Sequence, residues 1–168
     1  MRIISVIMGP TFSGKTTYLN KEWIKDRFGH HIIAHTTRPS REDEEDGIDY
    51  YFDSFLSDSY QRICVRQYKV ANGDIWSYWI NKNDILDNRN NYIILDYTGF
   101  NEIYEMFNDD ENTEVIGFYM ATPLSIIEDR IKNSSRKNED IKETTRRLHQ
   151  DIKDFEGIYE DSRVKLIK

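Results

Sequence analysis

The chain has little that suggests secretion or a membrane: one cysteine, three prolines and no long apolar segment among its 168 residues. A lone cysteine, Cys64, cannot form an internal disulfide, which favours a reducing compartment. No stretch approaches the roughly 18 consecutive apolar residues that indicate a membrane-spanning helix, and no charged and then apolar leader begins the chain. From these features we expect a cytoplasmic protein without a membrane partner.

Positive charge is also in short supply, because 23 Lys and Arg residues face 30 Asp and Glu residues, for a net charge of −7. This balance does not favour a broad basic surface of the kind that binds nucleic acid, so we expect no nucleic-acid partner. If the substrate is anionic, basic residues have to be concentrated locally, and the arginine positions become informative. The length suits one domain with its own core and is too short for two full domains.

The most specific motif is GPTFSGKT, which fits G-x-x-x-x-G-K-[ST] and follows the apolar run Arg2 to Met8. In this motif backbone N–H groups surround phosphate oxygens, the lysine reaches the β- and γ-phosphates, and the last hydroxyl holds Mg²⁺. The alternative interpretation of the motif is an ordinary Gly-rich turn. However, the motif lies between a predicted strand and a predicted helix, which is the placement that phosphate binding requires. We expect an ATP-binding loop made of Gly9, Pro10, Thr11, Phe12, Ser13, Gly14, Lys15, Thr16 and Thr17.

The remaining sequence alternates between strand and helix patterns. Apolar runs predict strands at Arg2 to Met8, His31 to His35, Tyr92 to Asp96, Val115 to Met120 and Val164 to Ile167. Helical spacing predicts helices at Lys15 to Phe28, Gly99 to Phe107, Pro123 to Lys132 and Glu139 to Phe155. Runs such as YIILD are apolar without alternation, as a parallel sheet covered on both faces requires. The order predicts a three-layer α/β/α fold with a parallel sheet.

The rhythm changes between Thr36 and Asn90, where short segments rich in Tyr, Trp and Asp replace the alternation. Asn72-Gly73 lies between two β-prone runs and predicts a hairpin of residues 63–70 and 75–80. We interpret this region as a lobe inserted into the α/β core. Its acidic cluster, Glu42 to Asp46, is most simply a solvated loop, although it can also position the neighbouring arginines.

A second motif lies in this lobe: HTTRPSREDEEDGIDYYF is similar to the T-T-R-x-x-R-x-x-E-x-x-G-x-D-Y-x-F segment of the guanylate kinase family. The matching positions are Thr37, Arg38, Arg41, Glu44, Gly47, Asp49, Tyr50 and Phe52. Further on, LDYTG resembles the family's L-D-x-x-G, and Arg136 with Arg147 resembles its pair of lid arginines. The resemblance covers nearly the whole chain, although we expect no counterpart of the family's C-terminal helix after Ile167.

This resemblance implies a P-loop NTPase fold with a core of residues 1–35, 81–130 and 145–168, a monophosphate-binding lobe at 36–80 and a helical lid at 131–144. It implies a nucleoside monophosphate kinase that uses ATP and Mg²⁺ to phosphorylate GMP or dGMP. The partners are then small-molecule nucleotides, and the protein is a monomer or homodimer. An acceptor phosphate has a second pKa of about 6. No general base is therefore needed, and catalysis consists of positioning and charge neutralisation.

The resemblance also implies roles for individual residues. The implied catalytic residues are Lys15, Arg38, Asp96, Arg136 and Arg147. The residues implied to bind the acceptor phosphate are Arg38, Arg41, Tyr50 and Tyr78. The planar fork of arginine pairs with phosphate oxygens, and the tyrosines donate hydrogen bonds from their hydroxyl groups. Thr16 and Asp96 would hold Mg²⁺, Asp96 through water, or Asp96 would instead orient an arginine. Arg130 is either a further lid arginine or a surface residue.

The sequence departs from the family where the base is recognised. The family has a small hydroxyl residue at the position of Ala34, a glutamate at that of Cys64 or Gln67, and a Ser or Thr near Ile80. With fewer polar partners, discrimination between bases should be blunted, unless Asp74 supplies a carboxylate. A further pocket candidate is Trp76, which stacks on the base or packs in the hairpin.

Two alternatives to a (d)GMP kinase stay open. One is a kinase for another, possibly modified, deoxynucleoside monophosphate. The other is a non-catalytic guanylate kinase-like binding module, against which the intact Lys15 and Thr16 argue, because such a module needs no phosphate-binding lysine.

Overall fold

The main sheet has five parallel strands in the order β2-β7-β1-β8-β9. The structure is a computed structural model that describes residues 1–55, 61–70, 73–134 and 141–168. The strands of this sheet are β1 (Arg2–Met8), β2 (Gly29–His31), β7 (Asn90–Ile94), β8 (Thr113–Met120) and β9 (Val164–Ile167). β1 lies at the centre, and its Ile4, Val6, Ile7 and Met8 are fully buried, as expected for a parallel strand covered on both faces.

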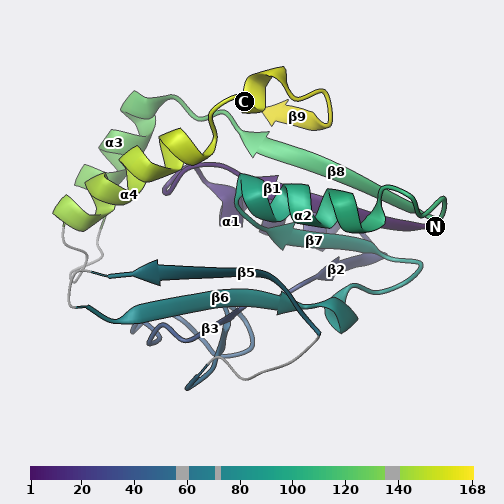
Figure 1. Cartoon of the computed structure of the whole chain (residues 1–168). Coiled ribbons are helices and arrows are strands. Elements are labelled where there is room, and N and C mark those ends of the chain that lie inside the picture. Colours follow the sequence, from purple (N-terminus) through teal and green to yellow (C-terminus); the bar gives the residue numbers. More distant parts are fainter. Residues whose placement is uncertain (56–60, 71–72, 135–140) are drawn as a thin grey trace.

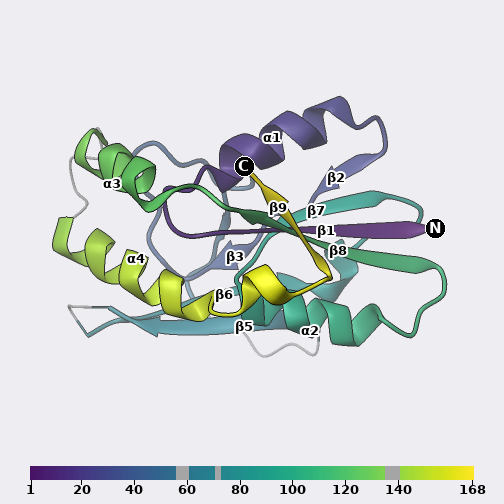
Figure 2. The same ribbon diagram turned by 90° about the horizontal axis from the view of Figure 1, so that it is seen from above.

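Helices cover both faces of this sheet and gather at one of its ends. α1 (Lys15–Lys25) and α2 (Tyr97–Phe107) lie on opposite faces, which gives the three layers that the sequence predicts (Figures 1 and 2). α3 (Leu124–Lys132) and α4 (Ile141–Asp154) lie at the carboxyl ends of the strands (Figure 1). Two short 3₁₀ helices, η1 (Lys82–Asp84) and η2 (Ile158–Glu160), complete the elements described. Among the described residues, no helix has the length and apolar character needed to span a membrane.

A second sheet lies below the main one in Figure 1, with the strand order β4-β3-β6-β5. It consists of β3 (His35–Thr36), β4 (Tyr51–Phe52), β5 (Arg62–Lys69) and β6 (Ile75–Asn81). β5 and β6 pair antiparallel, so the predicted hairpin is confirmed. The register shifts between Ile63 and Arg66, and Cys64 there has a φ of 53°, which is the irregularity of a β-bulge.

The predicted strand from His31 to His35 is wrong, because the chain changes sheets within it. β2 ends at His31, β3 begins at His35, and the residues between them cross from the main sheet to the second. Ile32 is nevertheless buried, and its N–H donates to Tyr92 O at 2.9 Å. An apolar, extended segment looks the same in sequence whether it stays in one sheet or passes between two.

The end of one helix and the start of another also differ from the prediction. α1 ends at Lys25, three residues before the prediction, because Asp26 is extended and its N–H donates to Trp23 O. The helix predicted to begin at Pro123 begins at Leu124, with Pro123 as its N-cap, and the Thr122 hydroxyl donates to Ser13 O at 2.8 Å. Thr122 therefore supports the glycine-rich loop, Gly9 to Thr16, instead of capping the helix.

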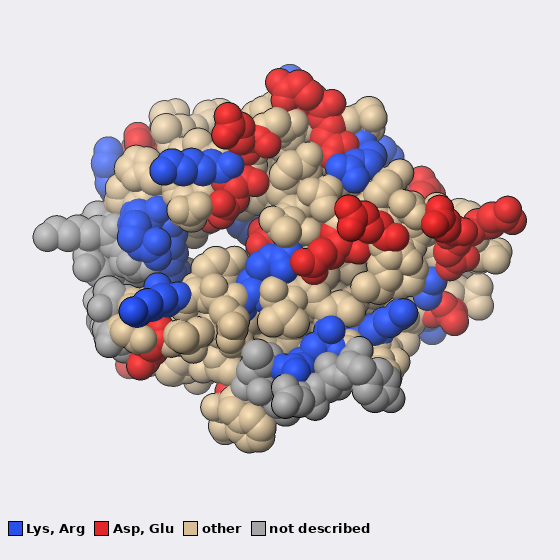
Figure 3. Space-filling model, viewed as in Figure 1, with Lys and Arg blue, Asp and Glu red and all other residues tan. Residues whose placement is uncertain are grey.

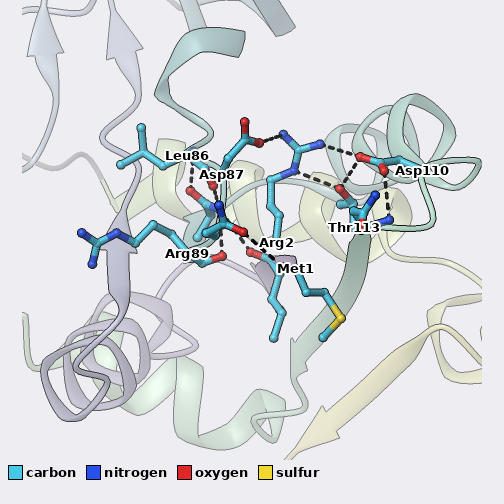
Figure 4. A network of polar contacts seen from close by, with 11 residues as sticks. Met1, Arg2, Leu86, Asp87, Arg89, Asp110 and Thr113 are labelled. Atoms are coloured by element: carbon cyan, nitrogen blue, oxygen red, sulfur yellow. Dashed lines mark hydrogen bonds and ion pairs between the residues drawn. The ribbon is translucent and has the colours of Figure 1, made fainter.

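Arg2 holds the amino ends of β1 and β8 together, at the end of the sheet opposite the glycine-rich loop (Figure 4). Its Nε donates to Thr113 Oγ1 at 3.0 Å, and its two Nη groups donate to Asp87 and Asp110 at 2.8 and 2.9 Å. The guanidinium also lies 4.5 Å from the centre of the Phe107 ring. These contacts join the starts of β1 and β8 to the ends of neighbouring connections.

Asp161 and Arg163 attach the segment that leads into β9 to α2. Arg163 Nη2 lies 2.5 Å from Asp161 Oδ2 and 2.8 Å from Asn101 Oδ1, and Tyr97 Oη donates to Asp161 at 2.8 Å. The Asp161 side chain is only 8% exposed. The hydrogen bond from Arg163 lowers the pKa of Asp161 to about 2, so the folded protein strongly favours the carboxylate.

We expect Asp161→Asn to destabilise the fold at pH 7 by about 2 kcal/mol, because the carboxyl pKa is lowered from a usual value near 4 to about 2. A lowered pKa contributes stability above the unfolded pKa, and this contribution disappears as the pH falls from 5 toward 2. Urea unfolding of wild type and variant across this range measures the difference. Asp109→Asn, at an exposed position, is the control. A cost for Asp161→Asn that does not change with pH would contradict the assignment.

Candidate active site

The glycine-rich loop turns sharply between the end of β1 and the start of α1. Gly9 has a φ of 149° and Gly14 a φ of 96°, which side chains rarely permit. A Cβ atom at Gly9 would lie 2.8 Å from Ser13 Oγ and 2.9 Å from Met120 Cβ. Both glycines of the motif are therefore required by the backbone. The loop ends at the N-terminus of α1, where free N–H groups favour an anion.

Lys15 folds back over the loop. Its Nζ donates to Gly9 O at 2.7 Å and to Pro10 O at 2.8 Å. Burial lowers the pKa of Lys15 to about 8, and the charge of Asp151 opposes this shift. The lysine thus lies over the loop whose N–H groups would bind phosphate.

Three side chains from other elements hold the loop backbone. Besides Thr122 from the end of β8, Arg130 on α3 donates from Nη1 to Phe12 O at 2.9 Å. Asp151 on α4 accepts from the N–H of Thr11 at 2.6 Å. Arg130, expected as a lid arginine or a surface residue, is exposed on α3 and also contacts the loop backbone.

The predicted acceptor-phosphate residues lie together in the second sheet and its connections. Arg38 is 5% exposed and donates to Glu44 Oε1 at 2.8 Å, while the Arg41 N–H donates to Glu44 Oε2 at 2.9 Å. Glu44 of the acidic cluster therefore positions both arginines and does not belong to a merely solvated loop. The Arg38 guanidinium lies 5.5 Å from the centre of the Tyr50 ring, which in turn lies 6.1 Å from the Tyr78 ring.

Tyr50 remains a hydrogen-bond donor in this environment. Burial raises the pKa of Tyr50, and the neighbouring Tyr78 adds to the shift. Two guanidinium groups and two phenols thus form a donor-rich cluster, which suits a phosphate.

One cleft joins this cluster to the glycine-rich loop. Its volume is about 1320 Å³, above the ~300–1,000 Å³ common for one small molecule. Lining residues include Lys15, Thr16, Ala34, Arg38, Arg41, Tyr50, Tyr78, Arg130 and Arg147. Figure 3 shows an opening in this face between α4 and the second sheet, bordered by Lys and Arg side chains and by Asp and Glu side chains. The cleft can hold two anionic groups at once.

Asp96 lies at the N-terminus of α2, with its oxygens engaged by three donors. Oδ1 accepts from the Gly99 N–H at 2.6 Å, and Oδ2 accepts from Arg66 Nε at 3.1 Å and from Tyr68 Oη at 3.5 Å. Asp96 thus orients an arginine, one of its two expected roles. Arg66 also donates to Glu102 at 2.9 Å.

Sequence reasoning missed Arg66. The signal was the hairpin register, which pairs Arg66 with Tyr78 and so puts both side chains on one face. Without the position of the bulge, this register was not fixed in advance.

Of the five predicted base-pocket residues, the structure brings only Ala34 to the cleft. Cys64 is buried and donates from Sγ to Gly99 O at 3.6 Å, and burial raises its pKa to about 12. Gln67 Nε2 donates to Ser77 Oγ at 3.1 Å, and Ile80 belongs to the core. Trp76 pairs with Tyr68 across the hairpin. Asp74 lies exposed beside the hairpin turn, and Arg136 lies outside the described residues.

Comparisons with known proteins agree on one family. A sequence model of guanylate kinase matches residues 1–161. A curated guanylate kinase from Cupriavidus pinatubonensis is 27% identical over 138 residues, which are 76% of this chain and 59% of that protein. One from Hydrogenovibrio crunogenus is 22% identical over 142 residues, 81% of this chain and 66% of that protein. The matches therefore span less than two thirds of these relatives.

A solved structure supports the fold. The crystal structure of guanylate kinase from Anaplasma phagocytophilum superposes with a TM-score of 0.54 at 17% sequence identity, covering 99% of this chain and 77% of that chain. At this identity the likeness concerns the fold, and it agrees with the P-loop NTPase architecture expected from the sequence.

We expect Glu44→Gln to destabilise the protein by about 2–4 kcal/mol, because it leaves the buried Arg38 without its charged partner. Glu42→Gln removes an exposed charge from the same loop and should cost less than about 0.5 kcal/mol. Chemical denaturation of both variants and the wild type measures the difference. Equal effects of the two substitutions would show that Glu44 does not organise the arginines.

Proposed function

The chain belongs to the guanylate kinase family, and on that premise we propose that it transfers the γ-phosphate of ATP to GMP or dGMP. The observation that carries this proposal is the single cleft shared by the glycine-rich loop and the cluster of Arg38, Arg41, Tyr50 and Tyr78. One end suits a triphosphate and the other a monophosphate. The presence of Lys15 and Thr16 supports a kinase over a binding module without catalysis.

The transfer needs positioning more than acid–base chemistry. An oxygen of the acceptor phosphate forms a bond to the γ-phosphorus while the bond from that phosphorus to the β–γ bridging oxygen breaks, and ADP leaves. The acceptor is already largely ionised, so no side chain has to remove a proton from it. Arg38 and Arg41 hold the acceptor, while Lys15 moves from the carbonyls of Gly9 and Pro10 to the phosphates of ATP.

We assign the remaining positive charge in the cleft to the triphosphate. Arg147 on α4 lines the cleft, and the family resemblance gives the same role to Arg136. Residues 131–144 would then act as a lid and residues 36–80 as the monophosphate-binding lobe. The proposal includes a cytoplasmic location, which the lone, unpaired Cys64 supports.

The family implies Mg²⁺, and the residues of the loop fit this ion. Thr16 is exposed at the start of α1 and lines the cleft, and the described residues contain no cluster of three or more His, Cys, Asp or Glu side chains that could hold a metal. Mg²⁺ commonly uses few protein ligands together with phosphate oxygens and water, so Thr16 is the ligand we propose. Asp96 suits this role less well, because its oxygens already accept three hydrogen bonds. When bound, the ion neutralises charge on the phosphates.

We expect Lys15→Met to lower kcat/KM by at least about 10³-fold, because it removes a charge that stabilises the transferring phosphoryl group. Methionine retains most of the aliphatic stem, so the fold should persist. Lys25→Met, at an exposed position at the end of α1, is the matched control and should keep normal turnover. A coupled ADP-release assay provides the measurement. Near-normal turnover by a folded Lys15→Met variant would refute the kinase proposal.

The preference of this protein for guanine over other bases should be weaker than is usual in the family. Ala34 offers no hydroxyl, Cys64 is buried against α2, and Ile80 lies in the core, so fewer partners remain for the N1 and N2 donors of guanine. A site without such partners discriminates far less than the ~10⁴-fold of a hydrogen-bonding site. Values of kcat/KM for GMP, dGMP, AMP, dTMP and dCMP measure this. Strong guanine selectivity that survives Asp74→Asn would contradict our placement of the base pocket.

A further inference from the structure

Asp151 presents a carboxylate to the loop that should bind phosphate. It lies on α4, 140 residues from Thr11 in sequence, and its Oδ2 accepts from the Thr11 N–H at 2.6 Å. Hydrogen bonds between an N–H group and an ionised carboxylate are shorter and stronger than neutral ones. An anion of the protein itself therefore occupies one donor of the loop.

Positive groups of the cleft also act on this carboxylate. Burial raises the pKa of Asp151, while the Thr11 N–H and the charges of Lys15 and Arg147 lower it. Asp154, three residues later on α4, is the negative neighbour and acts in the opposite direction. Thr11, Lys15 and Arg147 all line the cleft. The groups that attract Asp151 are thus the ones proposed to attract the triphosphate.

Resting on the proposed function, we propose that Asp151 is a built-in occupant of the triphosphate subsite, which ATP must displace in order to bind. Two anions cannot share the same donors without strong repulsion in a partly buried site. Displacement transfers the charges of Lys15 and Arg147 from the carboxylate to the nucleotide. Since Asp151 and Arg147 lie on one helix, binding of ATP becomes coupled to movement of α4.

Asp151→Asn tests this directly, because asparagine keeps the shape and an acceptor oxygen but removes the charge. Calorimetric titration with ATP and Mg²⁺ should show binding at least about tenfold tighter than in the wild type. Asp154→Asn removes the same charge from an exposed position of α4 and should change the affinity by less than about twofold. Asp151→Ser provides a second variant with a shorter side chain, and circular dichroism verifies that each protein is folded.

The outcomes separate this inference from the proposed function. Tighter binding by the Asp151 variants, with Asp154→Asn close to wild type, supports the displacement of Asp151. Unchanged or weaker binding by folded Asp151→Asn and Asp151→Ser, beside a wild type that binds ATP, overturns it and leaves the kinase proposal standing. Failure of every protein to bind ATP, the wild type included, would overturn the proposed function and this inference with it.

Discussion

The buried central strand β1 and the turn that follows it determine the rest of the site. Ile4, Val6, Ile7 and Met8 are fully buried, so the strand cannot shift, and its end fixes where the loop begins. At Gly9 the backbone turns too closely past Met120 for any side chain. The N–H groups of the loop are thereby held in place before a ligand arrives, and such preorganisation makes electrostatic stabilisation effective.

In and beside the cleft, positively charged side chains lie next to carboxylates. Arg38 and Arg41 share Glu44, Arg66 lies between Asp96 and Glu102, and Lys15 and Arg147 act on Asp151. Carboxylates thus position several of these cations, which limits the cost of burying them. Pairing of this kind also holds the cations in position before an anionic substrate binds.

Local patterns in the sequence predict much of this arrangement, and long-range packing accounts for what they miss. β1, β9 and the hairpin follow from apolar runs and turn residues, and the loop follows from its motif. The pairing of Arg66 with Asp96 and the contact of Asp151 with Thr11 join residues distant in sequence, and the crossing between β2 and β3 depends on where the two sheets lie. Periodicity carries no information about such pairs. They become visible only once the sheets are placed.

The central claim is that one cleft brings the triphosphate and the monophosphate together for direct transfer. Phosphorus NMR of the wild-type protein with ATP, Mg²⁺ and GMP tests it most directly, because it observes both products in one sample. Our account predicts that ADP and GDP appear in equal amounts, and only when enzyme, ATP and GMP are all present. Formation of ADP with inorganic phosphate and no GDP, or no turnover with any nucleoside monophosphate, would contradict it.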